Sequence, residues 1–384
     1  MLINPKLLVL LAAGSMTTMA GGVVAPILPE MIQQLQLDPA FAGLLVSIHC
    51  LTIALFSPLL GILADRVGRL SVLIASLVIY GICGAAGALF STLVPLLVVR
   101  GLLGAASGGI VASALGLLGS MYEGEARSQA LGYATSTLAL AGIAFPLLGG
   151  WVGATNWQFA FYLYGLALPI AGVAAWVLGQ KQQTRAKPIS KDSSNKLSSI
   201  LGDPHTLRLL LTLALSSIAM YAVVIYAPIY LKEEIGAGTI TNGIVLASRA
   251  LGAAMISAFG SKWLAKTLGT VQAAAVGFGL MALTLTTIPH LSKFNWILLT
   301  AVFFGVGFGI VLPTLYNALA TLAPSELRSS VLAAGTGAGF LGQFLSPVLL
   351  GPLLPYSGLE GVFYAAAIVA LVSGLLLFVP TGQS

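Results

Sequence analysis

Three basic side chains, His49, Arg100 and Arg249, lie inside long runs of apolar residues. A charge in such a run is costly to place in a membrane and is therefore a candidate functional group. Arginine keeps its positive charge and can bind an anion, whereas histidine gains and loses a proton near neutral pH. All three are candidates for binding a substrate or coupling a proton. Alternatively, the arginines stabilise packing by donating to helix carbonyls, and His49 is a satisfied core residue.

Acidic side chains are absent from the middle of these runs. Glu30 comes closest, because it follows Pro26 and Pro29 at the end of the first run. A coupled proton would then have to load on His49 or on Glu30. A positive or neutral interior favours anionic, zwitterionic or neutral hydrophobic substrates. Tyr226 could supply contact surface, although aromatic belts at the membrane interface are a commoner reason for tyrosines near helix ends.

A charged turn at residues 61–69 separates two of the apolar runs and reads Gly-Ile-Leu-Ala-Asp-Arg-Val-Gly-Arg. Its glycines allow two helices to reverse direction with little room between them. Asp65 contributes nothing to an orientation signal based on positive charge, so another role is favoured. A carboxylate here can interact with the positive end of a neighbouring helix. The alternative is a turn whose charges only set the orientation of the chain.

The composition places most of the chain in lipid. Only 7% of the residues are charged, 58% are hydrophobic and the mean hydropathy is +1.00, whereas soluble proteins are about a quarter charged. A spanning helix needs roughly 20 apolar residues. We therefore predict an all-α integral membrane protein with twelve transmembrane helices, at 6–28, 41–63, 70–90, 94–119, 129–152, 157–178, 206–231, 239–262, 268–289, 295–318, 328–352 and 359–379.

The net charge of +6 is explained by orientation and does not require a nucleic-acid partner. Of the seventeen Lys and Arg residues, two lie inside helices and two in loops on one side of the membrane. The other thirteen lie on the opposite side, which the positive-inside rule makes cytoplasmic together with both termini. These thirteen are Lys6, Arg66, Arg69, Arg127, Lys181, Arg185, Lys187, Lys191, Lys196, Arg208, Lys262, Lys266 and Arg328.

The chain contains an internal repeat. Ala25-Pro26-Ile27 recurs as Ala227-Pro228-Ile229, 202 positions later, and His49 corresponds to Arg249 at an offset of 200. Glu125, Arg127, Pro146 and Gly150 recur at an offset of 201 as Glu326, Arg328, Pro347 and Gly351. We therefore predict two pseudo-symmetric six-helix bundles, 1–179 and 206–384, joined by a polar cytoplasmic linker, 180–205. The second copy of the charged turn, near Gly260, has no aspartate.

The turn at 61–69 resembles the signature of the major facilitator superfamily, Gly-x-x-x-Asp-Arg-x-Gly-Arg. It keeps every residue that this pattern specifies, namely Gly61, Asp65, Arg66, Gly68 and Arg69. The resemblance implies a secondary transporter that works by alternating access, with this turn as a conformational switch. It also implies that Asp65 meets the start of helix 11, here Ser325–Arg328. Arg69 would pair with an acid at the end of helix 4, for which Glu123 is the candidate.

Two further segments extend the resemblance. Arg100, Gly101 and Gly104 resemble the family's second motif, an intramembrane arginine followed by spaced glycines. Pro146, Gly149 and Gly150 resemble the second half of the motif associated with antiporters, Gly-x-x-x-Gly-Pro-x-x-Gly-Gly, whose two earlier glycines are replaced here by Ala141 and Phe145. Exporters of cations in this family commonly have a carboxylate in the cavity, which this chain lacks.

We therefore expect a multidrug-type antiporter in the inner membrane that exports small amphipathic compounds against protons, as a monomer without cofactor, metal or nucleic acid. The first alternative is a transporter of organic or inorganic anions that uses Arg100, Arg249 and His49. An intramembrane transferase is the alternative from another class, but it would need a nucleophile or a metal site. The three histidines, His49, His205 and His290, are far apart in the chain, and no nucleotide-binding glycine motif is present.

Overall fold

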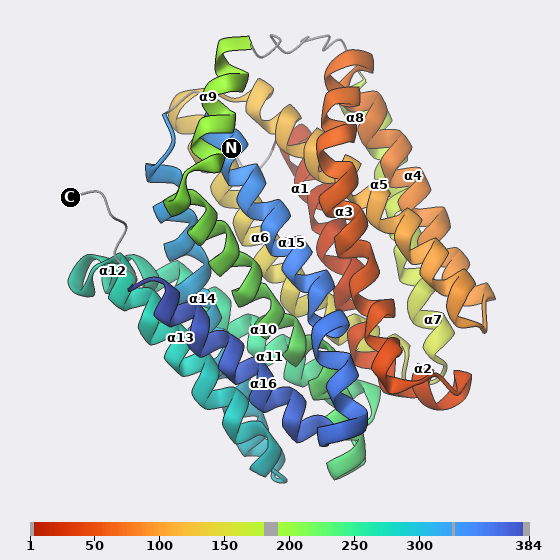
Figure 1. The fold of residues 1–384 in the computed structure, drawn as a ribbon. Coiled ribbons are helices and arrows are strands. Elements are labelled where there is room, and N and C mark those ends of the chain that lie inside the picture. The colour runs from red at the N-terminus through yellow and green to blue at the C-terminus, as the bar shows by residue number, and fades with distance from the viewer. Residues whose placement is uncertain (1–3, 180–190, 325–326, 379–384) are drawn as a thin grey trace. The chain divides into compact units, whose positions relative to one another are not determined.

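The computed structural model describes residues 4–179, 191–324 and 327–378. The regular structure in these ranges consists of α-helices and short 3₁₀ helices (Figure 1). Eleven stretches within them are long and apolar enough to cross a membrane. The last stretch, Arg328–Leu376, has 49 residues and would be about 74 Å long as a straight helix, against a hydrocarbon core of about 30 Å. It is interrupted at Gly351–Leu353 and thus has the length of two crossings, which agrees with the twelve helices predicted.

Contacts divide the chain into two compact units. The first comprises the described parts of residues 1–38, 42–187 and 236–247. Its helices are α1 (Pro5–Gly22), η1 (Ala25–Ile27), α2 (Leu28–Leu35), α3 (Pro39–Val67), α4 (Arg69–Ala86), η2 (Gly87–Leu89), α5 (Leu93–Met121), α6 (Gly124–Val152), α7 (Trp157–Tyr162), η3 (Leu163–Leu166) and α8 (Ala167–Leu178).

The second unit comprises the described parts of residues 39–41, 188–235 and 248–384. Helix α11 begins in the first unit and ends in the second. The remaining helices are α9 (Lys191–Gly202), α10 (Pro204–Ile235), α11 (Thr239–Phe259), α12 (Ser261–Leu268), α13 (Thr270–Thr287), η4 (Ile288–His290), α14 (Phe294–Thr321), α15 (Arg328–Leu350), η5 (Gly351–Leu353) and α16 (Leu354–Leu376).

The segment 180–205, predicted as a polar linker, is partly helical. Residues 180–190 lie outside the described residues, and the following stretch forms α9, which contacts α10 and α15. Asp203 then starts α10, because its Oδ2 atom accepts from the backbone N–H groups of His205 and Thr206 at 3.0 and 3.1 Å. Side-chain capping of this kind satisfies the free N–H groups of a first helical turn.

The internal repeat is present in the packing of each unit. In the first unit, α1 packs against α5, α6 and α8, and α4 packs against α5 and α8. In the second unit, α10 packs against α14, α15 and α16, and α13 packs against α14 and α16. Taken in chain order, these are the same pairs of helices. Two pseudo-symmetric bundles, as the sequence predicts, therefore share one packing scheme.

Glycines at matching positions serve the same purpose in both units. A Cβ atom on Gly104 would overlap the backbone carbonyl of His49, and one on Gly305 would overlap the backbone carbonyl of Arg249. Both pairs bring two helix backbones together, as small residues do in membranes. His49 and Arg249 therefore occupy equivalent positions on α3 and α11, as the offset of 200 predicts.

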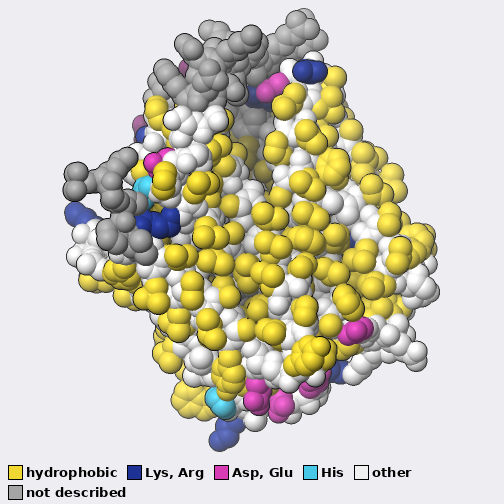
Figure 2. All heavy atoms as spheres, viewed as in Figure 1, with side chains coloured by type: hydrophobic (Ala, Val, Ile, Leu, Met, Phe, Trp, Pro, Cys, Tyr) yellow, Lys and Arg dark blue, Asp and Glu magenta, His cyan; other side chains and the backbone are white. Residues whose placement is uncertain are grey.

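The surface of the helices matches a lipid environment. Apolar side chains cover the middle of the helices on the visible face, whereas charged side chains gather near the helix ends (Figure 2). Large apolar groups are widely exposed, for example Trp176 at 79% and Leu59 at 59%. A soluble protein rarely exposes such extensive apolar surface. Lipid is therefore the solvent for these faces.

Candidate functional site

The charged turn predicted as a switch joins α3 to α4. Helix α3 ends at Val67, and Gly68 is the N-cap of α4 with φ +104°. A side chain at this φ would strain the backbone, so the glycine is required by the turn. Gly269 takes the same place before α13 with φ +86°. The decayed second copy has thus kept the glycine that the backbone needs, although Thr270 replaces the arginine.

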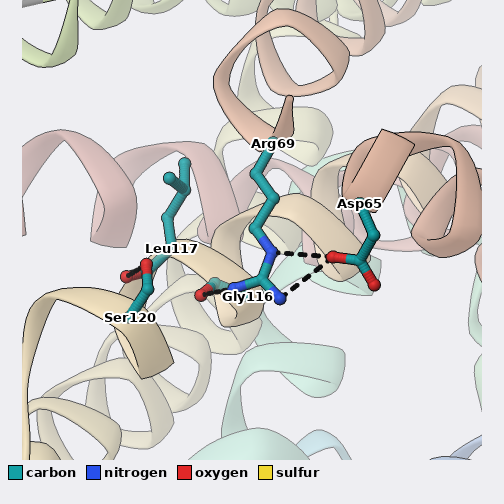
Figure 3. A network of polar contacts seen from close by, with 5 residues as sticks. All are labelled: Asp65, Arg69, Gly116, Leu117 and Ser120. Atoms are coloured by element: carbon teal, nitrogen blue, oxygen red, sulfur yellow. Dashed lines mark hydrogen bonds and ion pairs between the residues drawn. The ribbon is translucent and has the colours of Figure 1, made fainter. Parts of the chain in front are cut away.

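Arg69 connects three helices (Figure 3). Its Nη2 and Nε atoms lie 3.0 and 3.1 Å from Oδ1 of Asp65, the last-but-two residue of α3. Its Nη1 atom donates to the backbone carbonyl of Gly116 on α5 at 2.5 Å. Exposed ion pairs contribute about 0–1 kcal/mol, and the two side chains here are 22% and 47% exposed. Such a contact is weak enough to break during a conformational change.

The expected pairing of Arg69 with Glu123 is not present and is replaced by the contacts with Asp65 and Gly116. Arg69 reaches α5 at Gly116, more than a turn before that helix ends at Met121. Glu123 lies beyond this end and is the N-cap residue of α6. The other contact expected of Asp65, with Ser325–Arg328, involves residues 325 and 326, which lie outside the described residues.

The remaining residues of the turn also lie at helix ends. Arg66 is in the last turn of α3. Gly61 lies further back on the same helix, where an added Cβ would be 3.6 Å from the Cβ of Ala112 on α5. This is an ordinary van der Waals distance, so Gly61 is not required by close packing in this conformation.

Gly116 is a further residue of this contact that the sequence did not predict. A Cβ atom on this glycine would lie 2.9 Å from both Cδ and Nε of Arg69, so the missing side chain makes room for the arginine on the α5 backbone. A signal was available, since Gly104, Gly108, Ala112 and Gly116 form a stripe of small residues at every fourth position of one helix.

We expect Gly116→Val to displace Arg69 and to slow transport. Losing a hydrogen bond to a charged group costs about 1.5 kcal/mol or more, which shifts an equilibrium between two conformations roughly tenfold. Initial transport rates in reconstituted vesicles would measure this. Gly132→Val is the matched control, because a Cβ atom there meets nothing within 4 Å. Equal rates for the two variants would show that the Arg69–Gly116 contact does not matter for transport.

A second polar cluster lies in the interior of the first unit around Arg100, which is 1% exposed. Its Nε atom donates to the carbonyl of Leu45 at 2.9 Å, and Nη1 donates to Oη of Tyr164 at 2.9 Å. Its Nη2 atom donates to the carbonyl of Ala20 at 2.6 Å and lies 3.4 Å from Nδ1 of His49. The structure thus brings together two of the basic candidates, His49 and Arg100, and partners Arg100 with protein groups.

Two tyrosines complete this cluster and were missed from the sequence. Tyr164 donates through Oη to the carbonyl of Ala20 at 3.0 Å, and Tyr80 donates to the carbonyl of Met16 at 2.5 Å. The two rings meet edge to face, with centroids 5.7 Å apart. Both tyrosines lie in apolar runs, where a buried hydroxyl needs a partner. That requirement was the available signal.

Helix α1 stops where this cluster contacts it. It ends at Gly22 and is followed by the 3₁₀ turn η1 and by α2. Pro26 has no N–H group to donate to the preceding turn, and the last carbonyls of a helix lack partners within it. The carbonyl of Ala20 accepts from Arg100 and Tyr164 instead. A cation at this negative helix end is favourable.

The helix-5 motif lies against the same break in helix 1. A Cβ atom on Gly149 would lie 2.5 Å from the carbonyl oxygen and 2.7 Å from Cα of Val23. Pro146 and Phe145 pack on Gly22, where an added Cβ would lie 3.2 Å from the Cβ of Phe145. The Pro-x-x-Gly-Gly half of the motif therefore lets the α6 backbone approach the break closely.

Within the first unit, the start of α11 contacts the same region. Thr239 donates through Oγ1 to the carbonyl of Gly150 at 2.7 Å, and Asn242 donates through Nδ2 to the carbonyl of Pro26 at 3.1 Å. A Cβ atom on Gly150 would overlap the carbonyl of Thr239. The second glycine of the motif thus makes room for a neighbouring helix.

The other candidates are not part of this cluster. Arg249, on the part of α11 in the second unit, is partly buried, and its buried Nε has no hydrogen-bond partner among the described residues. Tyr226 on α10 is fully buried, and its Oη atom would lie 3.4 Å from a Cβ atom added to Gly351.

Glu30, in the first unit, is partly buried in the first turn of α2. Among the described residues, no group of three or more His, Cys, Asp and Glu could hold a metal ion.

Two repeated bundles of apolar helices, with a charged turn at helix ends and the buried Arg100 inside, define a multi-pass membrane protein and are typical of a transporter. The family model of the Major Facilitator Superfamily matches residues 10–347 and 240–383, and the chain belongs to this family.

Relatives agree with this assignment, and solved structures share the fold. The multidrug efflux protein YfmO of Bacillus subtilis is 25% identical over 93% of this chain and 88% of its own length. The quinolone resistance protein NorA of Staphylococcus aureus is 20% identical over 93% of this chain and 92% of its own length. A bacterial homologue of the human lysosomal transporter Spinster, solved in an inward-facing and occupied conformation, has a TM-score of 0.79 at 16% identity, covering 97% and 95%. The human organic anion transporter MFSD10 has a TM-score of 0.70 at 16% identity, over 97% of this chain and 99% of its own.

Proposed function

We propose that the protein is a proton-coupled exporter of small amphipathic compounds that works by alternating access. The observation that carries this proposal is the similarity to a multidrug efflux protein and to a quinolone resistance protein, each over 93% of the chain. It sits in the plasma membrane of a bacterium as a monomer, with both termini in the cytoplasm. Residues 1–179 and 206–384 are the two moving bundles.

The charged turn is the proposed switch. Arg69 links the ends of α3 and α4 to α5 through Asp65 and Gly116, and this contact is exposed enough to be exchanged for others. Gly68 permits the turn, and Arg66 and Glu123 provide charges at neighbouring helix ends. Because Thr270 replaces arginine in the second copy, the switch operates in the first unit.

The charge of the interior supports the proposed substrate class. Arg100 is buried and Arg249 is partly buried, and the eleven acidic residues lie near the ends of the predicted spans or in loops. A cationic substrate would gain no carboxylate partner in the interior of such a protein. Zwitterionic or neutral amphipathic compounds, including quinolones, fit this arrangement better.

The proposal is tested with purified protein in vesicles that have an acidic lumen and an alkaline outside. Norfloxacin, a zwitterionic quinolone, should accumulate in the lumen as protons leave, and nigericin should abolish this accumulation. Protein-free vesicles with the same gradient correct for passive trapping. Accumulation equal to that in protein-free vesicles would contradict the proposed function for this substrate class, and accumulation insensitive to nigericin would contradict proton coupling.

A second function, transport of anions, is favoured by the buried Nε of Arg249, which has no hydrogen-bond partner in the described part of the chain. A buried donor without a partner is costly, and an anionic group would supply one. The solved human organic anion transporter with the same fold makes this alternative worth testing.

We expect Arg249→Ala to reduce transport of an anionic dye at least tenfold, because a charge-assisted hydrogen bond contributes about 1.5–3 kcal/mol, and to spare a neutral dye. Fluorescein and a neutral rhodamine derivative serve as the two probes. Lys293→Ala removes a cation from an exposed position and should change neither rate. An equal loss for both dyes in Arg249→Ala would argue for a structural role of Arg249.

A further inference from the structure

We propose that His49 is the proton-binding residue of the transport cycle and that its protonation releases Arg100 from the end of helix α1. This inference rests on the proposed proton coupling and assigns that coupling to one atom, Nδ1 of His49. The argument starts from the contact between the two side chains in the interior of the first unit.

The contact with Arg100 favours a neutral imidazole. Nη2 of Arg100 lies 3.4 Å from Nδ1 of His49, and an arginine side chain can only donate. Nδ1 must therefore accept this hydrogen bond and carries no proton. The single ring proton is then on Nε2. Nε2 lies 3.4 Å from Sγ of Cys50, a weak acceptor. In this conformation His49 is neutral, and its basic nitrogen faces a guanidinium.

The surroundings offer no compensating negative charge. Besides Arg100 on α5, the titratable side chains of this cluster are Tyr164 on η3, Tyr80 on α4 and Cys50 on α3 itself. Helix α1 contributes the backbone carbonyls of residues 16, 19 and 20. In the part of the chain that the structure describes, no carboxylate is hydrogen-bonded to or ion-paired with either basic residue. A positive charge on His49 would therefore be repelled by the positive charge of Arg100.

A proton on Nδ1 would change the position of Arg100. The imidazolium would carry an N–H group directed at Nη2 and would place two like charges 3.4 Å apart in a region of low dielectric constant. The two side chains must then separate. The same Nη2 atom donates to the carbonyl of Ala20 at 2.6 Å. Separation from His49 therefore also disturbs the contact that Arg100 makes with the end of α1.

The end of α1 is positioned to respond. It leads into the break before Pro26, where the backbone cannot continue a regular helix. On one side Gly149 of the helix-5 motif approaches the backbone of Val23 at the break. On the other side Arg100 and Tyr164 hold the carbonyl of Ala20. The contact of Arg100 with the carbonyl of Ala20 depends on a neutral His49. Protonation of His49 is therefore coupled to the conformation of α1.

The direct test labels the histidines with ¹⁵N in the full-length protein in lipid bilayers. The chain has three histidines, so His205→Gln and His290→Gln assign the signals. We expect His49 to be the neutral Nε2–H tautomer at high pH and to become protonated as the pH falls. Protection of the backbone amides of residues 20–25 and 27 against hydrogen exchange, corrected for intrinsic pH dependence, should be lost over the same pH range.

Variants separate this inference from the proposed function. In His49→Gln, the amides of residues 20–25 and 27 should show no pH-dependent loss of protection, and norfloxacin accumulation driven by a pH gradient should be lost. His290→Gln is the matched control and should keep both. Accumulation in His49→Gln equal to wild type, or protonation of His49 without loss of protection in helix 1, would overturn the inference while leaving proton-coupled transport intact. Wild-type protein without gradient-driven accumulation would instead overturn the proposed function, and with it this role of His49.

Discussion

Replacement of Arg100 by leucine is expected to abolish transport and to destabilise the protein by about 3 kcal/mol. The change removes three hydrogen bonds from a charged donor to the carbonyls of Leu45 and Ala20 and to Tyr164. Hydrogen bonds to charged groups contribute about 1.5–3 kcal/mol each, and removal of the buried positive charge offsets part of this loss. Thermal unfolding followed by tryptophan fluorescence would measure the destabilisation.

Arg100→Lys distinguishes the charge from the geometry of the guanidinium. Lysine keeps the positive charge near the end of α1 but cannot donate from a planar fork to three helices at once. It should therefore recover part of the stability and little of the transport. If Arg100→Leu unfolded at the wild-type temperature and transported normally, the interior cluster would have neither role assigned to it.

Gly305→Val is expected to prevent assembly of a stable second unit. A Cβ atom at this position would overlap the backbone carbonyl of Arg249 and would lie 3.0 Å from the backbone nitrogen of Ala253. These are helix backbone atoms, which cannot move aside as the end of a flexible side chain can. Overpacking in a well-packed core costs about 1–3 kcal/mol and sometimes more, and here it separates α11 from α14.

Gly279→Val is the matched control for this effect, because it lies on the neighbouring helix α13 and an added Cβ meets nothing within 4 Å. Size-exclusion chromatography in detergent and the unfolding temperature would compare the two variants. A monodisperse Gly305→Val protein with the unfolding temperature of Gly279→Val would show that the close approach at Arg249 is not needed for the fold.

Most of the fold could be predicted from the sequence, because lipid imposes a simple rule on the chain. Twelve apolar stretches predict twelve helices, and the repeat at an offset near 200 predicts two bundles with the same packing. The paired glycines, Gly104 with Gly305 and Gly68 with Gly269, lie at equivalent places in both units. Each glycine is fixed by a backbone requirement, either a close approach of helices or a positive φ. Such requirements can be recognised in the sequence, because they conserve the same glycine at equivalent positions of the two repeats.

The partners of long side chains could not be predicted in the same way. Arg69 was expected to reach Glu123 but contacts Asp65 and the carbonyl of Gly116. The sequence makes Arg100 a candidate for direct substrate binding, but its nitrogens contact helix carbonyls, Tyr164 and His49. A sequence shows which side chains are charged, whereas the rotation of each helix decides which carbonyl a flexible arginine can reach. Backbone acceptors are present at every residue and carry no sequence signal.

The two units differ in their polar groups although they share a packing scheme. At an offset of 201, Thr270 replaces Arg69 and Ala301 replaces Arg100. The Arg69–Asp65 contact and the cap on helix α1 therefore both belong to the first unit. Arg249 occupies the position equivalent to His49, but it has no arginine counterpart beside it. We infer that the first unit carries the groups for proton coupling and switching, whereas Arg249 of the second remains available to a substrate.

The central claim, that substrate and proton move in opposite directions on this protein, has one direct test. Vesicles containing the protein and the pH-sensitive dye pyranine are loaded with norfloxacin at equal internal and external pH and are then diluted into norfloxacin-free buffer. Outward movement of norfloxacin should draw protons inward and acidify the lumen at a rate proportional to the protein content. Protein-dependent loss of norfloxacin at constant luminal pH would contradict proton antiport and would leave a transporter without proton coupling.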